Sequence, residues 1–75
     1  MTDLTLETIK TADGPDFLRS DGLHFFLITY PDGRAVLHRG RRWPNPPAVG
    51  LVEFEAGLFG KLEAAQRWIL DYRPE

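Results

Sequence analysis

A short basic segment, residues 34–43, holds the side chains that are best suited to chemistry. It carries four arginines, a histidine and a tryptophan: Arg34, Arg39, Arg41, Arg42, His38 and Trp43. Guanidinium groups contact phosphates and aromatic rings stack on bases, so this pattern suggests a nucleic-acid-binding surface built on the four arginines. The competing interpretation is that the arginines pair with acidic side chains of a neighbouring strand, such as Glu53 and Glu55.

The charge distribution singles out the same segment. Residues 1–33 carry six acidic and two basic side chains, and residues 43–75 carry five acidic and three basic ones. Residues 34–42 carry the four arginines and no acid. A compact basic segment therefore lies within an otherwise acidic chain, whose net charge is −2.

The sequence gives less support for a catalytic site or a metal site than for a basic binding surface. His24 and His38 would share one strand face, but their spacing matches no metal motif and the chain has no cysteine. A nucleophilic site needs a hydroxyl or thiol beside a histidine, and the only serine, Ser20, falls in a predicted turn. The glycines of Gly57–Lys61 lack the spacing of a phosphate-binding loop. We expect no enzymatic activity, no cofactor and no metal ion.

An apolar surface is the third candidate. Aromatic and β-branched side chains next to a histidine and an arginine have the composition of an interface core with a polar rim. The predicted partner-binding residues are Phe26, Ile28, Tyr30, Val36, His38 and Trp43. The competing interpretation is that the N-terminal segment covers this face, and that Trp43 packs on the prolines that follow it.

A predicted β-hairpin over residues 24–40 positions most of these side chains. Two apolar runs flank Pro31–Gly33. The proline presets φ to about −65°, and Gly33 takes the left-handed conformation that closes a three-residue loop. The resulting register places Tyr30 opposite Arg34, Ile28 opposite Val36, and Phe26 opposite His38. Because both hairpin faces carry large apolar side chains, both need to be covered.

The remaining elements follow from periodicity and punctuation. Leu4–Ile9 suits a short strand, although one or two helical turns would also fit. Pro15–Ser20 predicts one helical turn, because proline favours the first helical position. The prolines of the loop Arg41–Pro47 predict a stiff, extended connection. Residues 49–55 alternate as a half-buried strand, and Lys61–Tyr72 carries the apolar stripe of a helix.

These elements predict a small α+β domain spanning residues 1–75. Its sheet is antiparallel and three- to four-stranded, with the C-terminal helix packed on one face. The composition, 43% hydrophobic and 27% charged, is that of an ordinary globular domain. No secretory signal and no apolar run of membrane-spanning length is visible, so we expect a cytoplasmic protein without membrane contact.

The order of elements from Phe25 to Tyr72 resembles the DNA-binding domains that combine a three-stranded sheet with a helix, such as the plant AP2 domain and the arm-binding domains of tyrosine integrases. The segment from Gly60 to Ile69 is similar in style to the helix that follows their third strand. This resemblance implies DNA binding through the sheet. Where those domains present basic or neutral side chains on the third strand, this chain has Glu53 and Glu55.

The most consistent prediction is a non-catalytic binding module. It would act by protein–protein interaction, as an accessory, regulatory or inhibitor protein or as a homodimer, through the hairpin face and the Arg41–Pro47 loop. The alternative is a nucleic-acid-binding module that uses the basic segment Arg34–Trp43.

Overall fold

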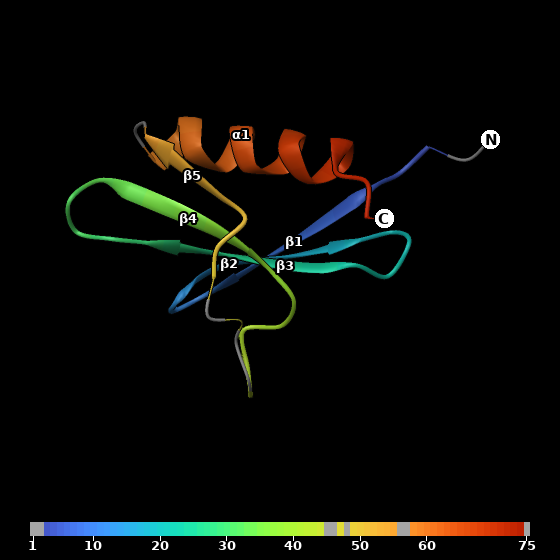
Figure 1. Cartoon of the computed structure of the whole chain (residues 1–75), viewed down its shortest axis with the longest axis horizontal. Helices are drawn as coiled ribbons and strands as arrows, with labels where there is room; N and C mark the ends of the chain where they lie inside the picture. Colours follow the sequence, from blue (N-terminus) through green and yellow to red (C-terminus); the bar gives the residue numbers. More distant parts are fainter. Residues whose placement is uncertain (1–2, 45–46, 48, 56–57, 75) are drawn as a thin grey trace.

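A computed structural model describes residues 3–44, 47, 49–55 and 58–74, with residues 58–60 described by their backbone only. The chain forms a five-stranded antiparallel sheet and one helix (Figure 1). The elements are β1 (Leu6–Thr11), β2 (Gly14–Arg19), β3 (His24–Thr29), β4 (Arg34–Arg39), β5 (Val52–Glu55) and α1 (Leu58–Asp71). Each strand pairs with the strand before it, so the order in the sheet is the order in the sequence.

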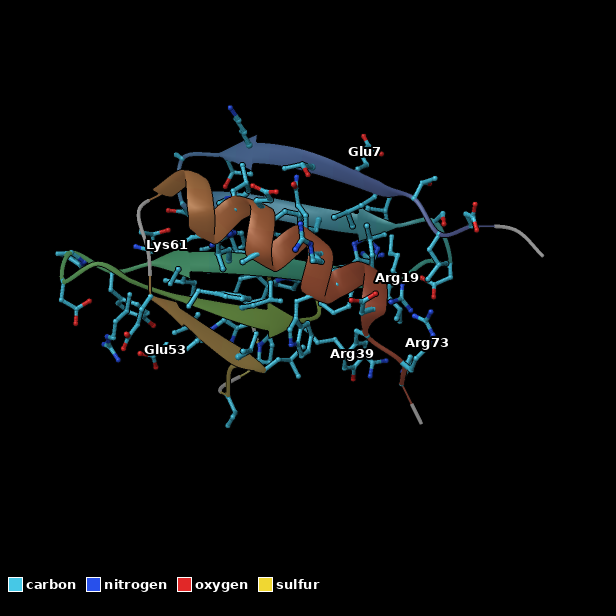
Figure 2. The ribbon with its side chains drawn as sticks, turned by 90° about the horizontal axis from the view of Figure 1, so that it is seen from above. Glu7, Arg19, Arg39, Glu53, Lys61 and Arg73 are labelled. Atoms are coloured by element: carbon cyan, nitrogen blue, oxygen red, sulfur yellow. The ribbon has the colours of Figure 1, made fainter. Side chains whose placement is uncertain are left out.

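The helix α1 lies across one face of the sheet, which we call the helix face (Figure 2). The core between them consists of side chains that alternate along the central strands together with two helix residues. Its buried members are Phe17, Phe25, Leu27, Ala35, Leu37, Ala65 and Ile69. Each large member contributes about 1.5–3 kcal/mol to folding by leaving water. We call the opposite face of the sheet the loop face.

The β3–β4 hairpin confirms the predicted register. Phe26 pairs with His38 and Ile28 with Val36, and the Tyr30 amide donates to the Arg34 carbonyl at 2.8 Å. Gly33 has a φ of +94°, which a residue with a side chain adopts only at a cost in energy. The turn chemistry of Pro31–Gly33 therefore predicted the pairing of the two strands correctly.

The segment Pro15–Ser20 is not helical, and the prediction of a helical turn there was wrong. It belongs to β2, where Phe17 and Arg19 are buried on the helix face while Leu18 points to the loop face. This strand pairs with both β1 and β3. The sheet consequently has five strands, and the expectation of three or four was too low.

Other boundaries differ by a few residues. The first strand is Leu6–Thr11, shifted from the expected Leu4–Ile9, and the last strand is restricted to Val52–Glu55. The helix begins at Leu58, three residues before its expected start, and ends at Asp71. The loop Arg41–Pro47 lies partly outside the described residues, because Asn45 and Pro46 are not among them.

A buried arginine fastens the end of β2 to the end of α1. The Nη1 atom of Arg19 donates to the carbonyl oxygens of Ile69 and Tyr72, both at 2.6 Å. Its Nη2 atom donates to Asp21 at 2.6 Å, and this contact lowers the pKa of the Asp21 carboxyl group. A guanidinium group at this place donates to carbonyls at the C-terminal end of α1 and just beyond it, and its positive charge interacts favourably with the negative end of the helix dipole.

Candidate protein-binding surface around Trp43

The connection between β4 and β5 crosses the loop face and places Arg42 in its centre. Only 7% of Arg42 is exposed. Its Nε atom donates to Asp16 Oδ1 at 2.8 Å, and its Nη2 atom donates to the carbonyl oxygens of Leu27 at 3.0 Å and Pro15 at 3.2 Å. Its Nη1 atom reaches the carbonyl oxygen of Asp13 at 3.2 Å. All of these acceptors belong to β2, β3 or the turn before β2.

The position of Arg42 has a specific cause in the sheet. The β2–β3 register, in which Asp16 pairs with Phe26, continues to bring Pro15 opposite Leu27. A proline has no N–H group, so β2 cannot donate to the Leu27 carbonyl. The guanidinium group of Arg42 supplies the missing donor. A loop side chain therefore completes the hydrogen bonding of the sheet where β2 begins.

Arg42 also covers the apolar side chains of the loop face. Its guanidinium carbon lies 4.9 Å from the centre of the Phe26 ring, a cation–π distance. The Phe26 ring in turn stacks on His38, with centroids 4.8 Å apart and planes at 4°. Gly50 lies so close to Val36 that a β-carbon at position 50 would overlap the valine side chain. The loop thus packs tightly on both sides of the histidine.

His38 is the buried titratable group beneath this loop. It is 6% exposed, and neither of its ring nitrogens makes a hydrogen bond with the described part of the chain. Burial is the main cause that lowers the pKa of His38. The Val49 backbone opposes it in part, and the positive charge of Arg42 adds a smaller lowering. The neutral imidazole is therefore the form that fits this site.

Trp43 follows Arg42 directly, and 66% of it is exposed. A groove of about 430 Å³ lies on one side of it, with Ile9, Leu18, His24 and Arg41 among its lining residues. A smaller groove of about 270 Å³ lies on the other side, between Trp43 and Ile28. We call Ile9, Leu18, His24, Arg41 and Trp43 together the Trp43 surface.

The structure separates the partner-binding residues predicted from the sequence. Phe26 and His38 are buried beneath the loop, and Ile28 and Val36 are half-buried. Tyr30 is 37% exposed at the hairpin end, with the Arg34 guanidinium carbon 5.1 Å from its ring centre. Of the six residues, Trp43 alone has most of its surface accessible. The connection between β4 and β5, which carries Arg42, covers the hairpin face that contains Phe26 and His38. Within the described residues, the N-terminal segment does not cover it.

Two residues of the Trp43 surface, Ile9 and Leu18, were missed in the sequence. Both point to the loop face from β1 and β2. Their placement depends on the alternation of β2, which the helical interpretation of Pro15–Ser20 obscured. The sequence carries no clear signal for them, because Asp16–Arg19 does not alternate between polar and apolar residues and one of its two buried side chains is the charged Arg19.

The four arginines do not gather on one surface. Arg34 pairs with Asp32 at 2.9 Å and lies 3.8 Å from Glu53, as the competing interpretation of the basic segment predicted for a neighbouring-strand acid. Arg39 contacts the hydroxyl of Tyr72 at 3.3 Å, beside the end of α1. Arg42 is buried, and within the described residues Arg41 takes part in no ion pair.

The two histidines differ in burial. His38 is enclosed, while His24 is half-buried at the wall of the larger groove. Among the residues that the structure describes, no three His, Cys, Asp or Glu side chains are grouped as metal ligands. Within the same residues, no helix combines the length and the apolar character needed to cross a membrane.

Comparisons with protein-family models, with curated proteins and with solved structures give no match to this chain. The resemblance to sheet-and-helix DNA-binding domains is thus one of element order over part of the chain. β1 and β2 precede that part and extend the sheet to five strands.

Proposed function

We propose that this chain is a non-catalytic protein-binding module that contacts its partner through the Trp43 surface. The observation that carries the proposal is an exposed indole next to a buried, multiply hydrogen-bonded arginine. Arg42 fixes the backbone on one side of Trp43, so little conformational freedom remains to be lost on binding. Exposed tryptophan and arginine side chains beside pockets are frequent sources of binding energy in protein interfaces.

The lining of the larger groove indicates the chemistry of the partner. Ile9 and Leu18 supply apolar surface, and Arg41 supplies an exposed positive charge at the same groove. A segment of another protein that inserts an apolar side chain beside Trp43 and places a carboxylate near Arg41 would complement both features. We therefore take the occupant to be such an acidic and apolar segment of a different protein.

A pair of peptide display libraries tests this proposal. Both vary an apolar position, flanked by Asp and Glu in one library and by Lys in the other. We expect selection on the immobilised protein to enrich the acidic library only. Trp43→Ala should weaken the selected peptides at least tenfold, which corresponds to about 1.4 kcal/mol, and Arg41→Ala should reduce the preference for acidic flanks.

A matched control is Arg73→Ala, because Arg73 is also exposed and its hydrogen bonds to the described residues are to the carbonyls of Leu70 and Tyr72, away from the Trp43 surface. This variant should bind the selected peptides as the original protein does. The variant Trp68→Phe leaves Trp43 as the sole tryptophan, whose emission should shift to the blue when a peptide covers it. Failure of both libraries to enrich, or enrichment that persists in Trp43→Ala, contradicts the proposal.

The nucleic-acid alternative receives less support from the same geometry. Binding that tracks a phosphate backbone needs several cations on one surface. Here Arg42 is committed to Asp16 and to main-chain carbonyls, and Arg34 is paired with Asp32. Of the arginines that line the larger groove beside Trp43, only Arg41 is then available to contact a phosphate.

A further inference from the structure

The outer edge of β1 is open to strand pairing. β1 is the first strand in the sheet and has β2 as its neighbour on one side only. It runs in unbroken register with β2, from Leu6 opposite Arg19 to Thr11 opposite Gly14. Edge strands are commonly protected by prolines, bulges, short length or charged side chains. β1 has six residues with neither a proline nor a bulge, and its charged residues are Glu7 and Lys10.

One hydrogen bond determines which main-chain groups of β1 are free. The Ser20 amide donates to the Thr5 carbonyl at 2.9 Å, so Thr5 directs its main-chain groups towards the β2 side. Because this direction alternates along a strand, the N–H and C=O groups of Leu6, Thr8 and Lys10 point away from the sheet. The contact to Thr8 from Gln66, at 2.9 Å, uses the threonine hydroxyl and leaves the main chain available.

The helix leaves this edge uncovered. It packs mainly against β5 and β2, and Figure 2 shows β1 along the margin of the sheet with Glu7 beyond the strand. The opposite edge, β5, has only four residues and is in contact with α1. Within the described residues, β1 is thus the longer and more accessible of the two edges.

We propose that two copies of this chain pair through β1 as an antiparallel homodimer with one continuous sheet. This contact uses the main-chain edge of β1, which adjoins the Trp43 surface at Ile9, and it goes beyond the proposed function. A second copy is the occupant because the strand can meet itself without conflict. A two-fold axis at Glu7 or Lys10 would oppose like charges, whereas an axis at Thr8 or Ile9 does not.

The axes at Thr8 and Ile9 are the two that centre the pairing on β1 without opposing like charges, and they use different contacts. An axis at Thr8 pairs this residue with itself and joins the free groups of Leu6 to those of Lys10. An axis at Ile9 joins Thr8 to Lys10 and brings Ile9, which is 46% exposed, against its copy. Ile9 also lines the groove beside Trp43, so in either register the grooves of the two copies meet near the axis on one face.

Single cysteine variants test the pairing directly, because the chain has no cysteine of its own. Directly opposite residues of an antiparallel pair have β-carbons about 4.5–5.5 Å apart, and small adjustments allow a disulfide. After mild oxidation we expect a covalent dimer from Thr8→Cys or from Ile9→Cys. The neighbouring variants Glu7→Cys and Lys10→Cys are the controls and should remain monomeric on a non-reducing gel.

A second experiment removes the free donor without touching the β1–β2 ladder. Thr8→Pro deletes the outward N–H group, and Thr8→Val removes the hydroxyl contact to Gln66 while it keeps that group. Sedimentation velocity of the unmodified chain should show a dimer at high concentration, unchanged in Thr8→Val. In Thr8→Pro the dissociation constant should rise at least about tenfold, because a bond is lost in each copy.

Circular dichroism shows whether Thr8→Pro is folded. If it is not, the cysteine variants alone test whether the two copies pair through β1. A chain that stays monomeric from micromolar to millimolar concentration overturns the proposal. Equal cross-linking at all four positions does so too, because random collision has no register. A dimer that a folded Thr8→Pro leaves intact would place the contact elsewhere.

Discussion

Arg42 supplies a donor at the position of the sheet where the main chain has none. The carbonyl of Leu27 faces Pro15 and receives its hydrogen bond from a side chain that comes from the β4–β5 loop. Arg42 is only 7% exposed, so its removal takes a largely buried donor away from this carbonyl. A buried carbonyl left without a donor costs about 1–3 kcal/mol, and Asp16 would lose its partner as well.

Arg42→Ala should therefore lower the free energy of unfolding by about 3 kcal/mol or more. Pro15→Ala restores an N–H group opposite Leu27, so Arg42→Ala should cost less in that background. Urea unfolding of the single and double variants gives the coupling between the two positions. Arg41→Ala is the control, because this exposed neighbour should change stability by less than about 0.5 kcal/mol. Equal costs of Arg42→Ala in both backgrounds would contradict the assigned role.

His38 gives the stability a dependence on pH. Its pKa is lowered in the folded protein, so the unfolded chain takes up a proton first as the pH falls. The stabilising effect of the neutral ring is complete above the ordinary histidine pKa of 6.5 and is lost as the pH falls from there to the folded-state pKa. Urea midpoints measured across this window should decrease with acidification.

The control for this prediction is His38→Phe, which keeps a ring against Phe26 but cannot be protonated. The decrease near the histidine pKa should disappear in this variant. Asp21 acts in a separate window, since its pKa is lowered by the hydrogen bond from Arg19 and its contribution is lost below the ordinary value of 3.8. A decrease of unchanged size in His38→Phe would assign the effect to another group.

At the scale of elements, local chemistry explains which predictions were correct. The β3–β4 hairpin was predictable because Pro31–Gly33 and the flanking apolar runs specify a turn and a register by themselves. The identity of β2 was not, because Gly14–Asp16 has the residues of a helix start. Pairing with β1 and β3 outweighs that local preference, and pairing partners are distant information that periodicity over six residues does not contain.

The candidate site was predictable to the same limited extent. Trp43 was singled out from the sequence because an aromatic side chain among prolines and arginines is conspicuous, and the structure exposes 66% of it. The burial of Arg42 and Phe26 depends on the path of the loop over the sheet, which no local pattern encodes. Ile9 and Leu18 became part of the surface only once β2 was known to be a strand.

The attachment of α1 to the sheet depends on Arg19 in addition to apolar packing. Arg19→Met keeps much of the apolar stem but removes the short Arg19 hydrogen bonds to the carbonyls of Ile69 and Tyr72. These carbonyls then keep only the longer bonds from the Tyr72 amide, at 3.2 Å, and from Arg73 Nη1, at 3.0 Å, among the described residues. We expect a loss of about 2–4 kcal/mol in unfolding free energy and earlier exchange of amides in the last turn of α1. Arg39→Met, which changes an exposed arginine near the same helix end, should be close to neutral. Similar losses in both variants would count against this role of Arg19.

At the scale of the whole molecule, the two faces of the sheet are covered by different means. The helix face is closed by apolar packing of α1, and the loop face is closed by a loop with a buried cation at its centre. Within the basic segment, Arg42 closes the loop face and pairs with Asp16, and Arg34 pairs with Asp32. Among the described residues, the Trp43 indole stays exposed beside two grooves, and the outer edge of β1 has no strand partner.

The hydrogen bonds from Arg42 also bear on how the molecule opens. Arg42 is separated from Leu27 by 15 positions in the chain and from Pro15 by 27 positions. The two hydrogen bonds therefore depend on a loop and not on a continuous strand ladder. Segments held by loops generally open at a lower free energy than core ladders. When the loop lifts, the start of β2 loses its hold on β3, and the β1–β2 ribbon is freed at one end. We therefore expect the β2–β3 boundary to open first at the end marked by Pro15 and Leu27, and amide protection should be lower there than in the rest of the sheet.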